Sequence, residues 1–216
     1  SPMSFFLNII PTILKLAGHH LLLSLTPLFI STLIALPLGW YLQRHPRLAG
    51  PVLGFFGVVY TIPSIALMIL LIPLLGLNQR TVIAALILYT QIFRLRNVLA
   101  GLNGIDPAVM EAARGMGMNA LQIAWRVQLP LALPVILAGV RLAAVVSIAI
   151  ATIGAKFGAG GLGTLLFDGL AQAGRMDKIW IGALSVAALA FLFNDGLQRL
   201  ERRTSYRERL KSDSGA

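Results

Sequence analysis

The chain has 216 residues, of which 57% are hydrophobic and only 12% are charged, about half the charged fraction of a soluble domain. Its mean hydropathy is +0.81, and its apolar runs approach the roughly 20 residues that cross a bilayer as a helix. The net charge is +10, but no aromatic residues interleave the basic ones to stack bases, so we expect no nucleic-acid partner. The absence of cysteine excludes a thiolate metal site, and we expect no bound metal. Composition therefore predicts an all-α polytopic integral membrane protein.

Long apolar stretches predict about five transmembrane helices. Ahead of the first, the shorter segment 5–16 contains Pro11 and Lys15, so we expect it to lie at the membrane interface. The third stretch contains Arg94 and Arg96, whose side chains are expected to snorkel to the headgroup layer. The predicted spans are 21–42, 52–75, 81–99, 133–153 and 179–197.

The second span carries a proline at its middle, in the sequence Tyr60-Thr61-Ile62-Pro63-Ser64. Proline lacks an amide donor and its ring clashes with the preceding turn, so the helix should kink or break there. Freed carbonyls in lipid need protein or a water-filled cavity around them. We therefore predict that Tyr60, Pro63 and Ser64 line a transport path, with a packing kink that touches no substrate as the alternative.

Basic residues set the expected orientation, because loops rich in Lys and Arg stay cytoplasmic. Twelve of the 18 basic residues fall on one side of the predicted spans, five fall on the other, and Arg141 lies inside a span. The basic side holds the loop 100–132 and the C-terminal tail. Both are predicted to be cytoplasmic.

The loop between the third and fourth spans has the signals of two short helices. Asp106 can cap a helix that begins at Pro107, and Gly115 or Gly117 can end it in a left-handed turn. A second short helix is predicted from Asn119, ending before Pro130. Its exposed apolar residues indicate a partner surface in the cytosol.

The same loop resembles the EAA loop of binding-protein-dependent ABC importer permeases, through Glu111-Ala112-Ala113, Gly117 and Leu129-Pro130. This resemblance implies a type I ABC importer permease core in which 1–216 is one transmembrane domain and 104–130 is the coupling loop. It implies that Glu111 makes a polar contact with the ATP-binding subunit and that the alanines allow close approach. The implied coupling residues are Glu111, Ala112, Ala113, Arg114, Gly115, Gly117, Leu129 and Pro130.

The resemblance also implies the partners. They are a second permease subunit, identical or paralogous, two ATP-binding subunits, an extracytoplasmic substrate-binding protein and the lipid bilayer of a bacterial or archaeal cell membrane. The chain has no Walker-type phosphate loop. We expect it to be a transport subunit that binds no cofactor and is not an enzyme, with ATP and Mg held by the partner subunit.

Several segments resemble more narrowly the osmoprotectant permeases for glycine betaine, choline or carnitine, which implies uptake of a quaternary ammonium compound. Such a cargo has no N–H to donate and would be met by aromatic faces through cation–π attraction, for which Tyr60, Tyr89 and Phe93 are candidates. The alternatives are an importer of methionine or another amino acid, a passive channel and a membrane-embedded enzyme. The segments that carry the resemblance are 60–67, 72–76, 94–97, 111–117, 129–141 and 158–163.

Four glycines, Gly158, Gly160, Gly161 and Gly163, follow the fourth span. Three of them fit the nucleotide-binding pattern G-x-G-x-x-G, but no strand precedes them. We expect a loop on the outer side that helps form a gate or meets the binding protein, or else a purely structural tight turn.

Few polar residues lie within the predicted spans. Our hypothesis is that Arg141 and Asp195 form an ion pair within the bundle. Both residues are also assigned to the transport path. The alternative is that Arg141 snorkels to the cytoplasmic surface. His19, His20 and His45 are each expected to be interfacial residues rather than metal ligands.

Overall fold

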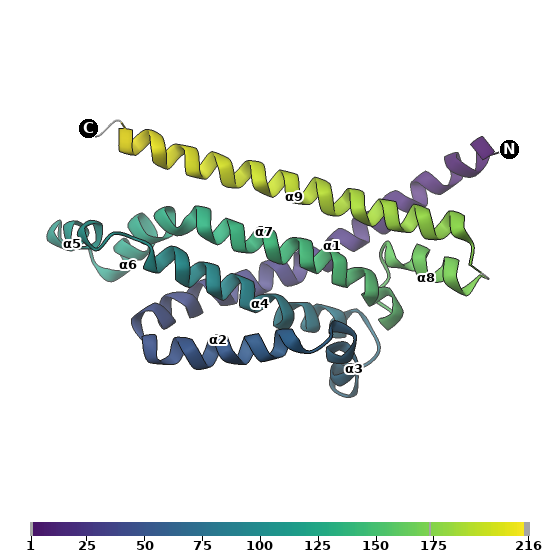
Figure 1. Cartoon of the computed structure of the whole chain (residues 1–216), viewed down its shortest axis with the longest axis horizontal. Coiled ribbons are helices and arrows are strands. Elements are labelled where there is room, and N and C mark those ends of the chain that lie inside the picture. Colours follow the sequence, from purple (N-terminus) through teal and green to yellow (C-terminus); the bar gives the residue numbers. More distant parts are fainter. Residues whose placement is uncertain (1, 173, 214–216) are drawn as a thin grey trace.

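The structure is a computed structural model that describes residues 2–172 and 174–213, with side chains for 10–172 and 174–203. Every regular element in this described part is helical (Figure 1). The elements are α1 (Pro2–Arg44), α2 (Pro46–Thr61), α3 (Ser64–Leu75), α4 (Gln79–Asn103), α5 (Pro107–Gly115), α6 (Ala120–Ile123), the π-helical turn η1 (Ala124–Gln128), α7 (Leu129–Gly154), the 3₁₀ turn η2 (Ala155–Phe157), α8 (Gly163–Ala171) and α9 (Met176–Asp213).

Among the described residues, four helical stretches are long and apolar enough to cross a membrane, and the bent pair α2 and α3 makes a possible fifth. This agrees with the predicted class and with about five spans. The four stretches are Ile10–Arg44, Gln79–Asn103, Ala120–Phe157 and Met176–Arg203.

The second predicted span is not one helix. α2 and α3 meet at an angle of 101° across Ile62 and Pro63. Both residues have extended ψ angles, of 127° and 133°. At Ile62 this follows from Pro63, because a proline disfavours helical backbone at the residue before it. At about 1.5 Å per residue, α2 is roughly 24 Å long and falls short of a hydrocarbon core of about 30 Å. The predicted break at Pro63 is confirmed, and the bent pair α2 and α3 covers the predicted span 52–75.

The segment 5–16 is also not a separate element. It forms the first turns of α1, which runs without interruption to Arg44 and includes Pro11, Pro27 and Pro37. The candidate span Ile10–Arg44 has 35 residues, which at about 1.5 Å each is much longer than the hydrocarbon core. The first predicted span therefore begins earlier than hydropathy alone indicated.

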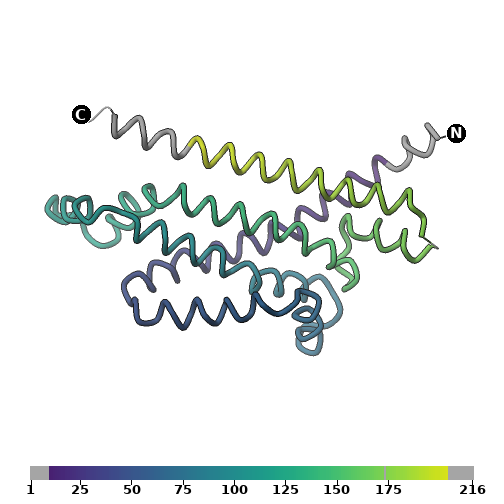
Figure 2. Tube along the Cα trace, viewed as in Figure 1, coloured from purple at the N-terminus to yellow at the C-terminus, as the bar shows by residue number. Residues whose placement is uncertain are grey.

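α4 lies at the centre of the bundle, between α1 and α7 (Figures 1 and 2). Small residues let these helices approach closely, as they do in membrane bundles. A Cβ atom built on Gly139 of α7 would lie 2.5 Å from Asn97 Cβ of α4, and one on Gly101 of α4 would lie 3.0 Å from the Ala132 carbonyl oxygen. α2 packs on α4, while α9 packs on α7 and α8.

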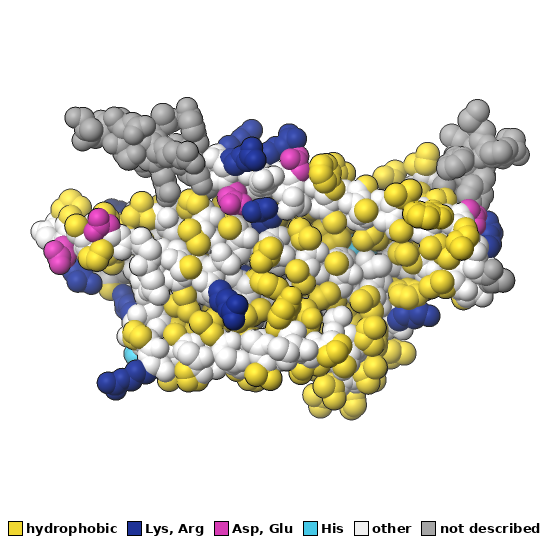
Figure 3. Space-filling view, viewed as in Figure 1, with side chains coloured by type: hydrophobic (Ala, Val, Ile, Leu, Met, Phe, Trp, Pro, Cys, Tyr) yellow, Lys and Arg dark blue, Asp and Glu magenta, His cyan; other side chains and the backbone are white. Residues whose placement is uncertain are grey.

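The two ends of the bundle differ. α5 and α6 protrude at one end, together with the last turn of α1, whereas α3, η2 and α8 gather at the other (Figure 1). We call these the α5 end and the α8 end. Hydrophobic side chains cover much of the face between them in Figure 3, and large apolar residues such as Phe29, Val58 and Phe191 are exposed, as expected for surfaces that face lipid or another subunit.

Candidate coupling loop and translocation path

The helix α5 begins as the sequence predicts. The Ala108 N–H donates to the Asp106 carboxylate at 2.8 Å, and Pro107 occupies the first helical position. The cap supplies a partner for one of the free amides of the first turn. The loop therefore starts at a fixed point directly after α4.

Gly117 makes the turn that ends α5. Its φ is +76°, its N–H donates to the Arg114 carbonyl at 2.9 Å, and the Met118 N–H donates to the Ala113 carbonyl at 3.2 Å. This pair of bonds is the Schellman motif, whose left-handed residue is usually glycine. A Cβ atom on Gly115 would meet no atom within 4 Å, so Gly117 is the glycine on which the turn depends.

The second loop helix starts as predicted but does not stop where predicted. Asn119 and Gln122 form a reciprocal capping box, with bonds of 2.8 and 2.9 Å. The helix then widens into the π-helical turn η1, in which the Leu129 N–H reaches the Ala124 carbonyl, and it continues directly into α7. The predicted end before Pro130 was wrong, because Pro130 does not stop the helix and lies in the first turn of α7, which continues directly from η1.

The loop presents most of its predicted coupling residues to the outside. Ala113 is 2% exposed and anchors α5, and Leu129 is half-buried. Large apolar residues stand among them: Val109, Met116, Leu121 and Trp125 are between 41% and 75% exposed. The exposed members of the predicted set are Glu111, Ala112, Arg114, Gly115, Gly117 and Pro130.

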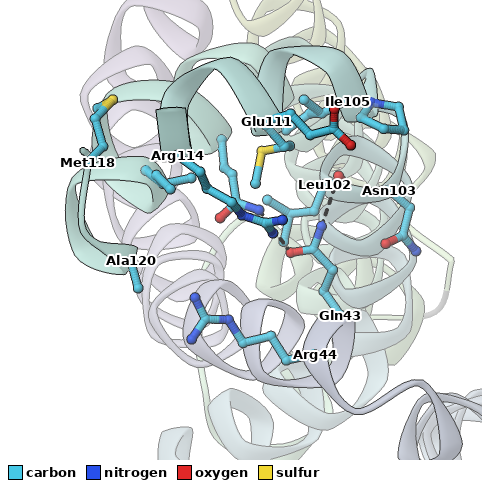
Figure 4. Close-up of a pocket in the computed structure, with 13 residues that line it drawn as sticks. Gln43, Arg44, Leu102, Asn103, Ile105, Glu111, Arg114, Met118 and Ala120 are labelled. Carbon is cyan, nitrogen blue, oxygen red and sulfur yellow. Dashed lines mark hydrogen bonds between the residues drawn. The ribbon is translucent and has the colours of Figure 1, made fainter. Parts of the chain in front are cut away.

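A pocket of about 700 Å³ lies behind α5 and α6, against the ends of α1 and α4 (Figure 4). Glu111 and Arg114 reach it from α5, while Gln43 and Arg44 reach it from α1. The coupling loop thus stands away from the bundle on one side and is joined to it at the floor of the pocket.

That floor contains a hydrogen-bonded relay that the sequence did not reveal. Trp40 Nε1 donates to Gln128 Oε1 at 3.1 Å, Gln128 Nε2 donates to Gln43 Oε1 at 3.1 Å, and Gln43 Nε2 donates to the Leu102 carbonyl at 3.0 Å. The guanidinium of Arg44 lies 3.6 Å from the Trp40 ring centroid, a cation–π contact. Three helices, α1, α4 and the η1 turn, are joined here by side chains distant in sequence.

The three aromatic candidates for the path lie together. The Tyr60 ring, at the end of α2, is 4.8 Å from the Tyr89 ring and 5.0 Å from the Phe93 ring, both on α4. Tyr60 is 38% exposed. Pro63 is exposed at the break and Ser64 is half-buried at the start of α3, so the broken helix and the aromatic cluster are adjacent.

The expectation for Arg94 was wrong. Its side chain is 1% exposed and points into the bundle, where Nε donates to Thr32 Oγ1 at 3.1 Å and Nη1 donates to Thr90 Oγ1 at 2.7 Å. Among the described residues, Nη2 has no hydrogen-bond partner. Arg96, two residues on, is exposed as the snorkelling prediction requires.

Arg141 and Asp195 do not pair. Arg141 Nε lies 3.0 Å from Glu201 Oε2, and its Nη1 is 3.5 Å from Asn194 Oδ1, while Asp195 pairs with Arg199 at 2.7 Å. Residues 194 and 201 are seven apart and share one face of α9, whereas residue 195 is turned about 100° away from that face. The predicted ion pair was therefore wrong.

The glycine segment packs over the two histidines of α1. Gly158, Gly160 and Gly161 all have φ between 74° and 81°. A Cβ atom on Gly161 would lie 2.9 Å from His20 Nδ1, and one on Gly160 would lie 2.9 Å from His19 Cε1. The turn is therefore tight because only glycine fits both its backbone and its neighbours.

His20 is a core residue and not the predicted interfacial one. It is 0% exposed, its Nε2 is 3.0 Å from the Ile148 carbonyl, and its Nδ1 accepts the Leu162 N–H at 3.3 Å. It joins α1, α7 and the loop before α8, which begins at Gly163. Sequence reasoning missed this because a histidine near a membrane edge gives no local sign of its partners. His45 is exposed at the turn between α1 and α2.

Apolar spanning helices, a broken helix and a protruding helical loop together define a multi-pass membrane permease. Residues 31–206 match the family described as binding-protein-dependent transport system inner membrane component. The chain belongs to this family. It is a transport subunit and not an enzyme.

Curated relatives match most of the chain. The carnitine transport permease protein OpuCB of Listeria monocytogenes is 40% identical over 86% of this chain and 84% of its own length. The glycine betaine/carnitine/choline transport system permease protein OpuCB of Bacillus subtilis is 36% identical over 87% and 86%. The osmoprotectant import permease protein OsmW of Salmonella typhimurium is 38% identical over 87% and 89%.

Among solved structures, a chain of the inward-facing MetNI methionine ABC transporter superposes with a TM-score of 0.80. The match covers 94% of this chain and 98% of that chain, at 22% sequence identity. It shows that the two chains share the type I ABC importer permease fold.

Proposed function

We propose that this chain forms the membrane path of an ATP-driven importer that takes up a quaternary ammonium osmoprotectant such as glycine betaine, choline or carnitine. Relatives with these printed cargoes are 36–40% identical to it over most of their length. The observation that carries the ATP-driven part is the coupling loop, a capped helix with exposed apolar residues and with an exposed Glu111 beside the pocket. A helix face of this kind needs a protein partner.

The α5 end is the cytoplasmic end in this proposal. It holds Arg44, Arg114 and Arg126, and most basic residues of the chain fall on that side of the spans. Two ATP-binding subunits dock there and hold ATP and Mg, and a second permease subunit completes the pore. A substrate-binding protein docks at the α8 end, outside the cell membrane of a bacterium or archaeon.

The coupling loop works as a lever. Closure of the ATP-binding subunits pushes α5, and the motion passes through α6 and η1 into α7, because these form one helical stretch, Ala120–Phe157. Packed helices move as rigid bodies, so a displacement at one end reaches the other. The two end states give alternating access.

The path runs beside the break between α2 and α3. Tyr60, Tyr89 and Phe93 present a cluster of aromatic faces that can attract a quaternary ammonium group without donating a hydrogen bond. Pro63 and Ser64 place the broken backbone next to it. The turn of Gly158, Gly160, Gly161 and Gly163 closes the outer end as a gate.

The test is uptake into proteoliposomes that contain the complex of this chain with its ATP-binding subunit and binding protein. We expect ATP-dependent accumulation of labelled glycine betaine, carnitine or choline, and no accumulation of methionine. Accumulation of methionine alone would assign the chain to amino-acid import. Movement of cargo down its gradient without ATP would show a passive channel.

A further inference from the structure

The π-helical turn η1 is a compliant point in the lever. It is the only departure from α-helical hydrogen bonding within Ala120–Gly154, and a π turn widens the helix by one residue. A push on α5 and α6 could be absorbed there as bending before it reaches α7. Pro130 and Pro134 in the first turns of α7 weaken the same region further, because neither can donate a backbone hydrogen bond.

Gln128 sits at the end of this turn and ties it to two other helices. Its side chain is 5% exposed, accepts from Trp40 Nε1 and donates to Gln43, which donates in turn to the Leu102 carbonyl. Each of the three side chains donates one hydrogen bond within this relay, which restricts their orientation. The relay contacts α1 through Trp40 and Gln43, and it contacts the last turn of α4 through the Leu102 carbonyl.

We propose that Gln128 is the positioning residue that transmits movement of the coupling loop to α1 and α4. This rests on the proposed function, because it names how the coupling loop acts on the helices beside the path. With the relay intact, α1, α4 and α7 move as one body when α5 is pushed. Without it, η1 bends, α7 alone responds, and ATP is hydrolysed without transport.

Apolar packing is the rival explanation. Leu42, Leu99, Leu102 and Ala132 form a buried cluster one turn away, and it could carry the motion alone. The two explanations predict different effects for Gln128→Leu. This substitution keeps the volume and apolar contacts of the side chain but leaves Trp40 Nε1 and Gln43 Oε1 without their hydrogen-bond partner. A buried unpaired polar group is costly, so the relay should open rather than stay in place.

The experiment compares the wild-type complex with Gln128→Leu, Gln43→Leu and the double variant in proteoliposomes, measuring both ATP hydrolysis and labelled glycine betaine uptake. We expect each single variant to keep the ATP-binding subunit bound and to raise the ATP hydrolysed per cargo by about fivefold, in the range found for coupling residues. The double variant should be no worse than the worse single variant, because both interrupt one chain. Gln198→Leu, half-buried on α9 and outside the relay, is the matched control and should keep the wild-type ratio.

A second readout needs no cargo. Hydrogen exchange is measured on the complex with and without ATP plus vanadate. In the wild type, exchange should change both in the coupling loop, 104–130, and in the last turns of α1, 37–44. In Gln128→Leu the change should stay within the coupling loop.

Two results would overturn the proposal: an unchanged ratio of ATP to cargo in Gln128→Leu, or an α1 response to nucleotide equal to that of the wild type. If Gln128→Leu does not assemble, Gln43→Leu gives the same comparison from the other side of the relay. A wild-type complex that accumulates none of the three cargoes would contradict the proposed function, and the exchange readout would still decide the role of Gln128.

Discussion

Three polar side chains inside the bundle, His20, Arg94 and Gln128, join helices that a hydropathy profile describes only as apolar. Each is at most 5% exposed and each contacts a helix far from its own in sequence. In lipid, a polar group that is not paired within the protein is expensive. These residues therefore fix which helix faces meet, and the apolar residues around them fill the space.

Arg94 gives a test of this at the scale of one side chain. Thr32→Val removes the acceptor of Arg94 Nε and leaves a buried charge with one bond fewer, so we expect the complex to lose about 1–3 kcal/mol of stability. Arg94→Leu removes the buried charge, so no hydrogen-bond partners are needed, and it should lower the stability of the complex less than Thr32→Val does. Thermal unfolding of the purified complex measures both, and a larger loss for Arg94→Leu would contradict the assignment.

Gly115 and Gly117 differ in what an added methyl group would do. Gly117→Ala forces a residue with a Cβ into φ of +76°, at a cost of about 1–2 kcal/mol. Gly115→Ala has open space within this chain and normal helical backbone. We expect Gly117→Ala to reduce recovery of the ATP-binding subunit in co-purification and Gly115→Ala to leave it near wild type. Equal losses for both would show that partner contact, and not the turn, governs the site.

At the scale of elements, the break between α2 and α3 follows from a single proline. Pro63→Ala restores an amide donor and removes the restriction on Ile62, so we expect α2 to extend and the 101° bend to open. Because the chain has no cysteine, Phe55 and Leu74 can each be replaced by cysteine and spin-labelled without labelling of any other site on this chain. In a straight helix the separation of 19 positions along the chain would correspond to about 28 Å, and we expect the measured distance to move towards that value. An unchanged distance would mean that packing on α4 sets the bend.

Sequence predicted those elements whose signals are local. The apolar runs, the cap at Asp106, the turn at Gly117 and the break at Pro63 each depend on a few neighbouring residues, and the structure contains all of them. The failures involve partners chosen by the tertiary fold. Arg141 contacts Glu201 and Asn194, which lie seven residues apart on one face of α9. No local pattern reveals that α7 packs against that face.

The same limit applies to the candidate site. The residues proposed for coupling were selected from their motif, and the aromatic residues from their chemistry, because both selections depend on residue type and spacing. The relay of Trp40, Gln43 and Gln128 could not, since its members lie 85 and 88 residues apart along the chain. Glutamine and tryptophan near a membrane boundary are common, and only the packing of α1 against η1 brings them together.

At the scale of the whole molecule, the two ends have different constructions. The α5 end has a protruding loop with polar, hydrogen-bonded joints, and the α8 end has glycine turns packed tightly against His19 and His20. A lever needs stiffness at its joints, and a gate needs close packing that a small displacement can undo. This difference fits an importer that receives force at one end and opens at the other.

The proposed import cycle depends most on the coupling loop, which the double variant Glu111→Ala/Gly117→Ala tests directly. Its matched control is Asp177→Ala/Gly174→Ala at the α8 end, where the glycine also has a positive φ of 73°. The measurement is ATP-driven accumulation of labelled glycine betaine by the reconstituted complex, together with recovery of its ATP-binding subunit. We predict that the loop variant loses about tenfold or more in accumulation while the control keeps its ATP-binding subunit. A loop variant that assembles and accumulates cargo as the wild type does would contradict the account.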